Sequence, residues 1–125
     1  MTAKTSPSRR QHIILIQNDP YLIASRKAVL ESRGYLVEVV AGVDEARARC
    51  KSFQCDLVIV DADKAHNTAV ELCEEIKQNN PSLNVVLMTG YHVYLHTTCP
   101  DEIVRQEEGP EGFVAKVENL LSPAA

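Results

Sequence analysis

The sequence predicts an α/β domain in which helices cover both faces of a doubly wound, five-stranded parallel sheet. Three observations support this fold class. Short apolar runs alternate with segments of helical periodicity along most of the chain. The apolar runs are continuous, as expected for parallel strands buried on both faces. The 125 residues suffice for one hydrophobic core and are too few for two. Right-handed crossovers then fix most of the topology.

The first half of the chain is predicted to contain two strand–helix units. The apolar run 12–16 is the first strand, and Asp19 followed by a proline is typical of a helix N-cap and first helical position. The helix that follows is expected to stop before Gly34. The second strand is expected over 35–40. A helix over 43–53 carries acidic residues early and basic residues late, which complements the helix dipole.

The second half repeats this alternation and then becomes less regular. The predicted order is a strand over 57–60, a helix over 68–78, a strand over 84–88, a weak strand over 102–105 and a helix over 110–121.

The intervening stretch 91–101 is ambiguous, because Tyr91 to Leu95 is compatible with a short helix whereas Thr97 to Pro100 interrupts it. We therefore expect a clipped or remodelled helix there.

Composition places the chain among cytoplasmic globular domains. No apolar run approaches the ~20 residues that cross a bilayer, so we expect no membrane association. Residues 1–11 are polar and basic and are expected to form a disordered tail, the folded domain is expected over 12–122, and 123–125 are expected to be a tail or the start of a linker. Without the three basic residues of the tail, 10 basic residues face 17 acidic ones. This acidic body disfavours direct nucleic-acid binding.

The cysteines and histidines give no strong metal signal. The cysteines lack Cys-x-x-Cys spacing, so buried reduced thiols are expected. His92 and His96 have i, i+4 spacing, but a solvated pair is favoured because no carboxylate accompanies them. The four cysteines are Cys50, Cys55, Cys73 and Cys99.

Asp61 is the main candidate for chemistry, since it ends a buried apolar strand at the sheet edge where α/β proteins bind ligands. A plain role as helix cap or turn residue is the alternative. Glycine-rich nucleotide loops and the Gly-x-Ser-x-Gly elbow are absent from the sequence. An enzyme that uses Asp61 as base or nucleophile is therefore the least favoured function, and we expect no enzymatic activity.

Several segments, in order and spacing, resemble the receiver domain of bacterial two-component response regulators over residues 12–122. They are Ile14-Leu15-Ile16 before Gln17-Asn18-Asp19-Pro20, then Gly34-Tyr35, Asp56-Leu57-Val58-Ile59-Val60-Asp61, Glu71-Leu72, Val85-Val86-Leu87-Met88-Thr89-Gly90 and the stretch 109–121. The resemblance implies a flavodoxin-like receiver fold, here with a shortened fourth helix.

The resemblance also implies a phosphorelay function. Asp61 stands where the family accepts a phosphoryl group from a histidine kinase, with Mg²⁺ held between it and an acidic pair after the first strand. The metal is needed because a carboxylate must attack an anionic phosphoryl centre. Thr89 stands at the switch hydroxyl, and a lysine usually lies near the end of the fifth strand. The implied partner is a histidine kinase or another signalling protein, with a homodimer as a further option.

Several family positions are altered in this sequence. The acidic pair is replaced by Gln17 and Asn18, with Asp19 as the nearby carboxylate; the lysine by Gln106; the aromatic switch residue by Ile103; and the loop after the acceptor contains Lys64-Ala65 and Thr68-Ala69. Loss of one carboxylate from a Mg²⁺ site removes attraction on the order of several kcal/mol, and Mg²⁺ exchanges water for neutral amides reluctantly.

We therefore expect weak Mg²⁺ binding at most, through Asp61, the backbone carbonyl of Asp63, and Asp19. Two functions follow. The first is an atypical receiver with impaired phosphorylation that acts mainly by protein–protein interaction. The second is a conventional Mg²⁺-dependent receiver that uses Asp61.

Overall fold

The structure of the chain is a computed structural model that describes residues 10–63 and 66–122. Its five strands form one parallel sheet in the order β2-β1-β3-β4-β5. This order places β3, which ends at Asp61, in the centre of the sheet and confirms the predicted fold class. The strands are β1 His12–Ile16, β2 Leu36–Val40, β3 Leu57–Asp61, β4 Asn84–Thr89 and β5 Glu102–Arg105.

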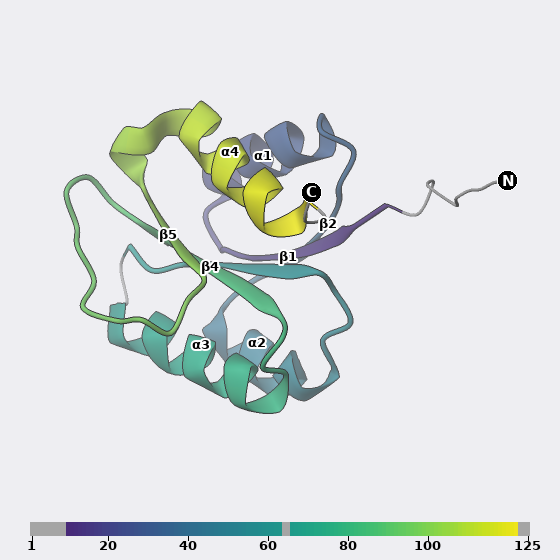
Figure 1. Cartoon of the computed structure of the whole chain (residues 1–125), viewed down its shortest axis with the longest axis vertical. Coiled ribbons are helices and arrows are strands. Elements are labelled where there is room, and N and C mark those ends of the chain that lie inside the picture. Colours follow the sequence, from purple (N-terminus) through teal and green to yellow (C-terminus); the bar gives the residue numbers. More distant parts are fainter. Residues whose placement is uncertain (1–9, 64–65, 123–125) are drawn as a thin grey trace, which may run out of the picture.

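Helices cover both faces of this sheet (Figure 1). One face carries α1 and α4, and the opposite face carries α2 and α3. Among the described residues, no helix is both long and apolar enough to cross a bilayer. The helices are α1 Pro20–Glu31, α2 Val43–Arg49, α3 His66–Asn79 and α4 Gly109–Leu121, with single 3₁₀ turns η1 Cys50–Ser52 and η2 Gln106–Glu108.

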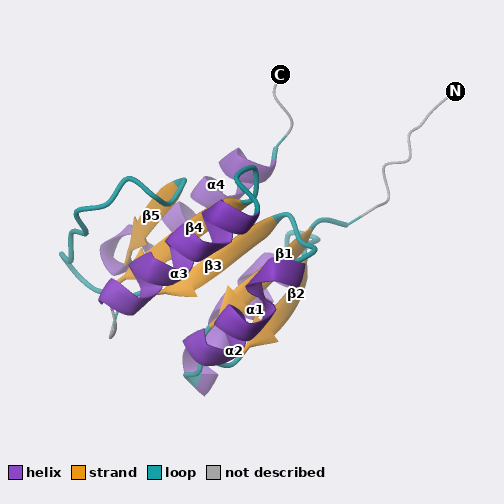
Figure 2. Cartoon of the chain, turned by 90° about the horizontal axis from the view of Figure 1, so that it is seen from below, coloured by secondary structure: helices purple, strands orange, loops and turns teal. Residues whose placement is uncertain are grey.

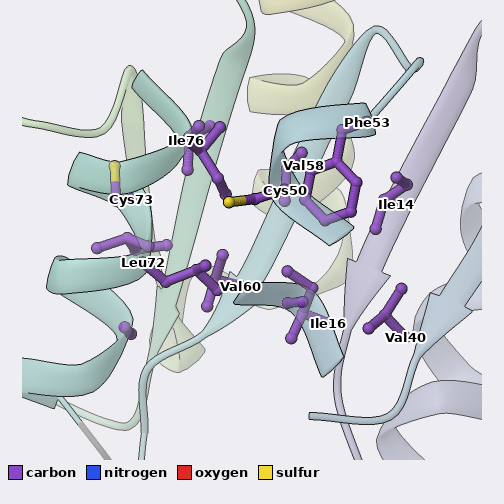
Figure 3. Close-up of a cluster of buried hydrophobic side chains, with 14 of the residues drawn as sticks. Ile14, Ile16, Val40, Cys50, Phe53, Val58, Val60, Leu72, Cys73 and Ile76 are labelled. Carbon is purple, nitrogen blue, oxygen red and sulfur yellow. The ribbon is translucent and has the colours of Figure 1, made fainter. Parts of the chain in front are cut away.

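The strands alternate their side chains between two hydrophobic clusters, one on each face of the sheet. In β1, Ile14 and Ile16 join the cluster under α2 and α3, while Ile13 and Leu15 join the cluster under α1 and α4. Figure 3 shows the first cluster, where Phe53 packs beside the β1 side chains. Because β1 and β3 are buried on both faces, their backbones hold the carboxyl edge of the sheet firmly.

The amino end of α1 and the end of the second helix were predicted closely. Asp19 is the N-cap of α1, since its side chain accepts hydrogen bonds from the backbone N–H groups of Tyr21 and Leu22. The predicted helix over 43–53 is α-helical to Arg49 and continues as η1.

The predictions for the chain ends and for one loop remain open. Most of the expected basic tail, the expected linker and Lys64-Ala65 lie outside the described residues. At the edge of the described chain, Gln11 donates its side-chain amide to the Leu121 carbonyl (3.0 Å) and accepts from the Leu36 N–H. Gln11 thus contacts the fold through both β2 and the end of α4.

The segment between β4 and β5 differs from the sequence expectation. We expected a clipped or remodelled helix there, and residues 90–101, all of which the structure describes, contain a turn, irregular chain and a bend but no helix. Figure 2 shows this segment as a long loop that leaves the sheet beside β4 and returns at β5. His92 has a positive φ of 54°, which is incompatible with a right-handed helix. Few inward apolar residues were available to hold a helix against the sheet.

Polar contacts of Asp101 hold the carboxyl-terminal end of this segment against α3 and β4. The Lys77 ammonium on α3 lies 2.6 Å from the Asp101 carboxylate, which also accepts the Val85 N–H at 2.8 Å. Leu95 and Cys99 pack partly buried against the α2/α3 cluster.

The first prediction concerns this loop, residues 90–101. Its amides should exchange with solvent fastest among the described ordered regions, because helical and ladder hydrogen bonds are absent between Tyr91 and Pro100. Hydrogen exchange resolved by mass spectrometry should show β3 protected far longer. Equal protection of the loop and β3 would mean that side-chain packing alone holds the loop closed.

Candidate functional site

The strand ends at the carboxyl edge of the sheet surround a small cavity of about 170 Å³. The loop after β1 and the end of β3 form its polar side, while the amino end of α1 and the chain after β2 form the rest. Its lining includes Gln17, Asn18, Asp19, Leu22, Gly42, Asp61 and Asp63. The sequence-predicted residues of the β1 and β3 loops are therefore brought together, as the fold class requires.

The Asp61 carboxylate has partners on both of its oxygen atoms. Its Oδ1 accepts the Asp63 N–H at 2.9 Å. Its Oδ2 accepts both the Gln17 side-chain amide at 2.5 Å and the Arg26 Nη1 at 2.8 Å. The side chain of Asp61 is only 14% exposed and that of Arg26 15% exposed, so this ion pair is largely shielded from water.

The orientation of the Gln17 side-chain amide is fixed by the hydrogen bonds that its oxygen atom accepts. Its Oε1 accepts the backbone N–H groups of Asn18 and Asp19, each at 2.9 Å. The Nε2 group is therefore the end that faces Asp61. Gln17 thus presents a hydrogen-bond donor where the receiver family presents a carboxylate, and it is itself buried.

Arg26 is the residue of the site that sequence reasoning missed as a partner of Asp61. It lies on α1 at helical spacing from Leu22, Val29 and Leu30, within the apolar stripe of that helix. A guanidinium in an inward-facing stripe requires a counter-charge, because burial of an unpaired charge is costly. This was the available signal, and Asp61 is that counter-charge.

The Thr89 hydroxyl is engaged within the loop that follows β4. It donates to the Val93 carbonyl at 3.2 Å, and Thr89 is only 4% exposed. Next to it, Gly90 is buried against Asp63, and a Cβ atom on Gly90 would overlap the Asp63 carboxylate. The loops after β3 and β4 are therefore packed directly against each other.

Two other positions at which this chain differs from the receiver family are Gln106 and Ile103, and their side chains are not among the hydrogen-bond partners of Asp61. Gln106 is exposed in η2 and lines a separate cavity beside Arg26 and Tyr91. Ile103 in β5 packs partly buried on the α2/α3 cluster. Glu107 accepts the His92 N–H at 2.9 Å.

The donor atoms at this site do not fit a Mg²⁺ ion. The Asp61 oxygens already face an arginine, an amide and a backbone N–H. Asp19 caps α1, and the Asp63 carbonyl accepts a ring nitrogen of His66 at 3.0 Å. Among the described residues, no group of three or more His, Cys, Asp or Glu side chains is arranged to hold a metal. A guanidinium beside the acceptor also repels a divalent cation.

Comparison with known proteins decides the family. The response regulator receiver domain family matches residues 13–120. The chain belongs to this family. Among curated relatives, the transcriptional regulatory protein GlrR of Escherichia coli is 27% identical over 105 residues, which are 84% of this chain and 22% of GlrR. The photosynthetic apparatus regulatory protein RegA of Cereibacter sphaeroides is 24% identical over 82 residues, covering 66% of this chain and 44% of RegA. The chain thus spans less than half of either relative.

Solved structures share the receiver fold. The response regulator TrrA of Thermotoga maritima, in complex with Mg²⁺ and BeF, aligns with a TM-score of 0.79 and 24% identity over 89% of this chain and 99% of that chain. A complex of the histidine kinase ThkA with TrrA aligns with a TM-score of 0.77 and 25% identity over 90% of this chain and 99% of that chain. A receiver domain from Methanospirillum hungatei aligns with a TM-score of 0.76, 24% identity and coverage of 90% and 94%.

The second prediction tests whether Arg26 and Asp61 interact. Arg26→Met should lower the free energy of unfolding by about 1–3 kcal/mol, because it leaves a shielded carboxylate with one fewer charged partner. In a double-mutant cycle with Asp61→Asn, much of this loss should disappear. Arg33→Met is the matched control, since the Arg33–Glu118 pair is 3.6 Å long and about half exposed, and it should cost about 0.5 kcal/mol or less. Additive effects of Arg26→Met and Asp61→Asn in urea denaturation would contradict the pairing.

Proposed function

We propose that this receiver domain acts mainly through protein–protein interaction, with phosphorylation of Asp61 impaired. The observation that carries the proposal is the Arg26–Asp61 ion pair, which shares Asp61 Oδ2 with the Gln17 amide. A carboxylate oxygen attacks a phosphoryl centre through a free lone pair. Here Asp61 Oδ2 accepts two short hydrogen bonds, one of them from the Arg26 guanidinium, and Oδ1 accepts one of ordinary length from the Asp63 N–H.

Electrostatics support the same conclusion. In the family, a metal ion neutralises the acceptor carboxylate together with the incoming phosphoryl group. In this chain Arg26 already neutralises Asp61 from within the fold. Gln17 and Asn18 add no negative charge, and the Asp19 side chain is engaged as the N-cap of α1. The Asp63 carboxylate is then the remaining acidic side chain of the cavity lining that could offset a Mg²⁺ ion placed next to that guanidinium. The negative charge of Asp61 is therefore balanced by Arg26, a residue of the fold itself, in place of a metal ion.

The fold of the domain supports a signalling protein as partner. Histidine kinases and other receivers are the favoured partners, because the five-stranded sheet of a receiver is retained and the ThkA–TrrA complex contains a receiver-fold regulator bound to a kinase. A homodimer is a further option. The acidic body argues against nucleic acid as a direct ligand of this domain, and a cytoplasmic location suits a kinase partner.

Conventional Mg²⁺-dependent phosphorylation is the second candidate. It is favoured by the retention of Asp61 at the end of β3 and of Thr89 at the end of β4, on neighbouring strands. For this function Arg26 would have to leave Asp61, and the Thr89 hydroxyl would have to leave the Val93 carbonyl.

The third prediction separates these two functions. Incubated with acetyl phosphate and Mg²⁺, the domain should show little or no phosphoryl mass increase at Asp61, and a Mg²⁺ titration should show no tight saturable binding. The control is a conventional receiver treated in parallel, with Asp61→Asn as the blank. Stoichiometric labelling that disappears in Asp61→Asn would overturn the proposal in favour of conventional phosphorylation.

The fourth prediction states what must be changed to obtain receiver chemistry. Gln17→Asp, Asn18→Asp and Gln106→Lys restore the family's charged groups, but the Arg26 guanidinium should still compete with the metal. Adding Arg26→Ala to these three changes should therefore give a Mg²⁺-dependent rise in Tm on the order of 5 °C or more, together with labelling at Asp61.

The three-change variant that retains Arg26 is the matched control and should gain much less of either response. A folded four-change variant with neither response would show that the shape of the loops, and not only their charge, prevents phosphorylation.

A further inference from the structure

Two cysteines from different parts of the chain meet at the surface of the α2/α3 cluster. The Cys73 and Cys99 sulfur atoms lie 2.9 Å apart, although the residues are separated by 26 positions in the sequence. Cys73 is on α3 and fully buried, and Cys99 is half-buried near the end of the loop 90–101. Figure 3 shows Cys73 on α3, with its sulfur pointing away from the side chains of Cys50 and Ile76.

The structure holds this pair in place from both sides. α3 is anchored by its buried apolar side chains, which fix Cys73 on the sheet. The loop is anchored near Cys99 by the Lys77–Asp101 ion pair and by the Thr97 hydroxyl, which accepts the Cys99 N–H at 3.1 Å. A disulfide has sulfur atoms about 2.05 Å apart, so closure requires a movement of only about 0.9 Å along the S···S direction.

We propose that Cys73 and Cys99 form a reversible disulfide that fastens the β4–β5 loop to α3. The oxidant is a hydroperoxide such as hydrogen peroxide. The Cys99 sulfur first attacks one peroxide oxygen, the O–O bond breaks, and Cys99 becomes a sulfenic acid while one water is released. The Cys73 sulfur then attacks the Cys99 sulfur, the S–O bond breaks, and the second water leaves as the S–S bond forms. Two thiol hydrogens and two electrons pass to the peroxide, and a dithiol reverses the reaction.

The environments of the cysteines assign the order of these steps. Burial, together with the neighbouring Cys99 thiol, raises the pKa of Cys73, so Cys73 is a poor initial nucleophile. Cys99 is the more exposed of the two and meets the oxidant first. Cys50 is buried, and burial raises the pKa of Cys55 to about 11. Among the described residues, neither is within hydrogen-bonding distance of another cysteine sulfur.

The disulfide would act on the loop that carries the Thr89 contact. The Thr89 hydroxyl donates to the Val93 carbonyl, and Val93 belongs to the loop 90–101 that also contains Cys99. Fastening that loop to α3 limits the movement of the loop and so favours the hydrogen bond between the Thr89 hydroxyl and the Val93 carbonyl. Oxidation would thus stabilise the present arrangement of the site, whether or not Asp61 is ever phosphorylated.

The test is oxidation of the folded domain with hydrogen peroxide, followed by alkylation under denaturing conditions, intact mass and peptide mapping. The expected result is a monomer lacking two alkylatable thiols, with Cys73 and Cys99 in one linked peptide. Dithiothreitol should restore both thiols. Hydrogen exchange of residues 90–98 should slow roughly ten-fold on oxidation and recover on reduction.

The variants make the assignment specific. Cys99→Ser, at a half-buried position that tolerates a hydroxyl, should retain all remaining thiols and show no change in loop exchange, whereas the matched control Cys55→Ser should behave as the parent. The proposal is overturned by any of four results. These are no thiol loss, linkage to Cys50 or Cys55, a disulfide-linked dimer, or over-oxidation of Cys99 without linkage.

Discussion

The pairing of the Asp61 carboxylate with the Arg26 guanidinium is the constraint around which the carboxyl edge of this domain is organised. Asp61 ends the central strand and is mostly shielded, so its charge needs compensation from the fold itself. α1 supplies that compensation through a long side chain that crosses from the helix to the strand end. Gln17 completes the arrangement by donating to the same oxygen and by accepting the first two N–H groups of the chain that leads to the Asp19 cap. The charge of Asp61, the rotamer of Gln17 and the start of α1 are thus parts of one hydrogen-bonded unit.

The fold was predictable because it depends on repeated local signals. Each strand is an apolar run, and α1 begins where Asp19 and Pro20 supply a cap and a fixed φ. The positions of the candidate site residues followed from the fold, since parallel strands end at one edge. What the sequence did not reveal was which partners they choose. The place of Arg26 in the apolar stripe of α1 indicates that it needs a counter-charge but does not say which one, because Asp61 lies 35 positions away and a single sequence contains no contact information.

The β4–β5 segment, which is ambiguous in the sequence, illustrates a related limit of local patterns. Tyr91 to Leu95 has enough apolar character for a helical turn, but helix formation requires packing against the sheet, and only Leu95 and Cys99 of this segment join the α2/α3 cluster. In this stretch the local sequence allows a helical turn, but too few side chains pack against the sheet to stabilise a helix, and the segment forms a loop. The loop is instead held by polar contacts at its two ends, with Glu107 near its start and Lys77 near its finish.

The contact between Gly90 and Asp63 couples the loop after β3 to the loop after β4 at this edge of the sheet. Position 90 has no room for a methyl group while residue 63 keeps a carboxylate directed at it. Asp63 is exposed, and the atom that meets the added Cβ is the end of its side chain. An alanine at position 90 therefore requires the Asp63 carboxylate to rotate away from the loop after β4. A side chain at position 90 would thus change the direction of a carboxylate on the loop after the central strand, so residue size in one loop sets side-chain orientation in the other.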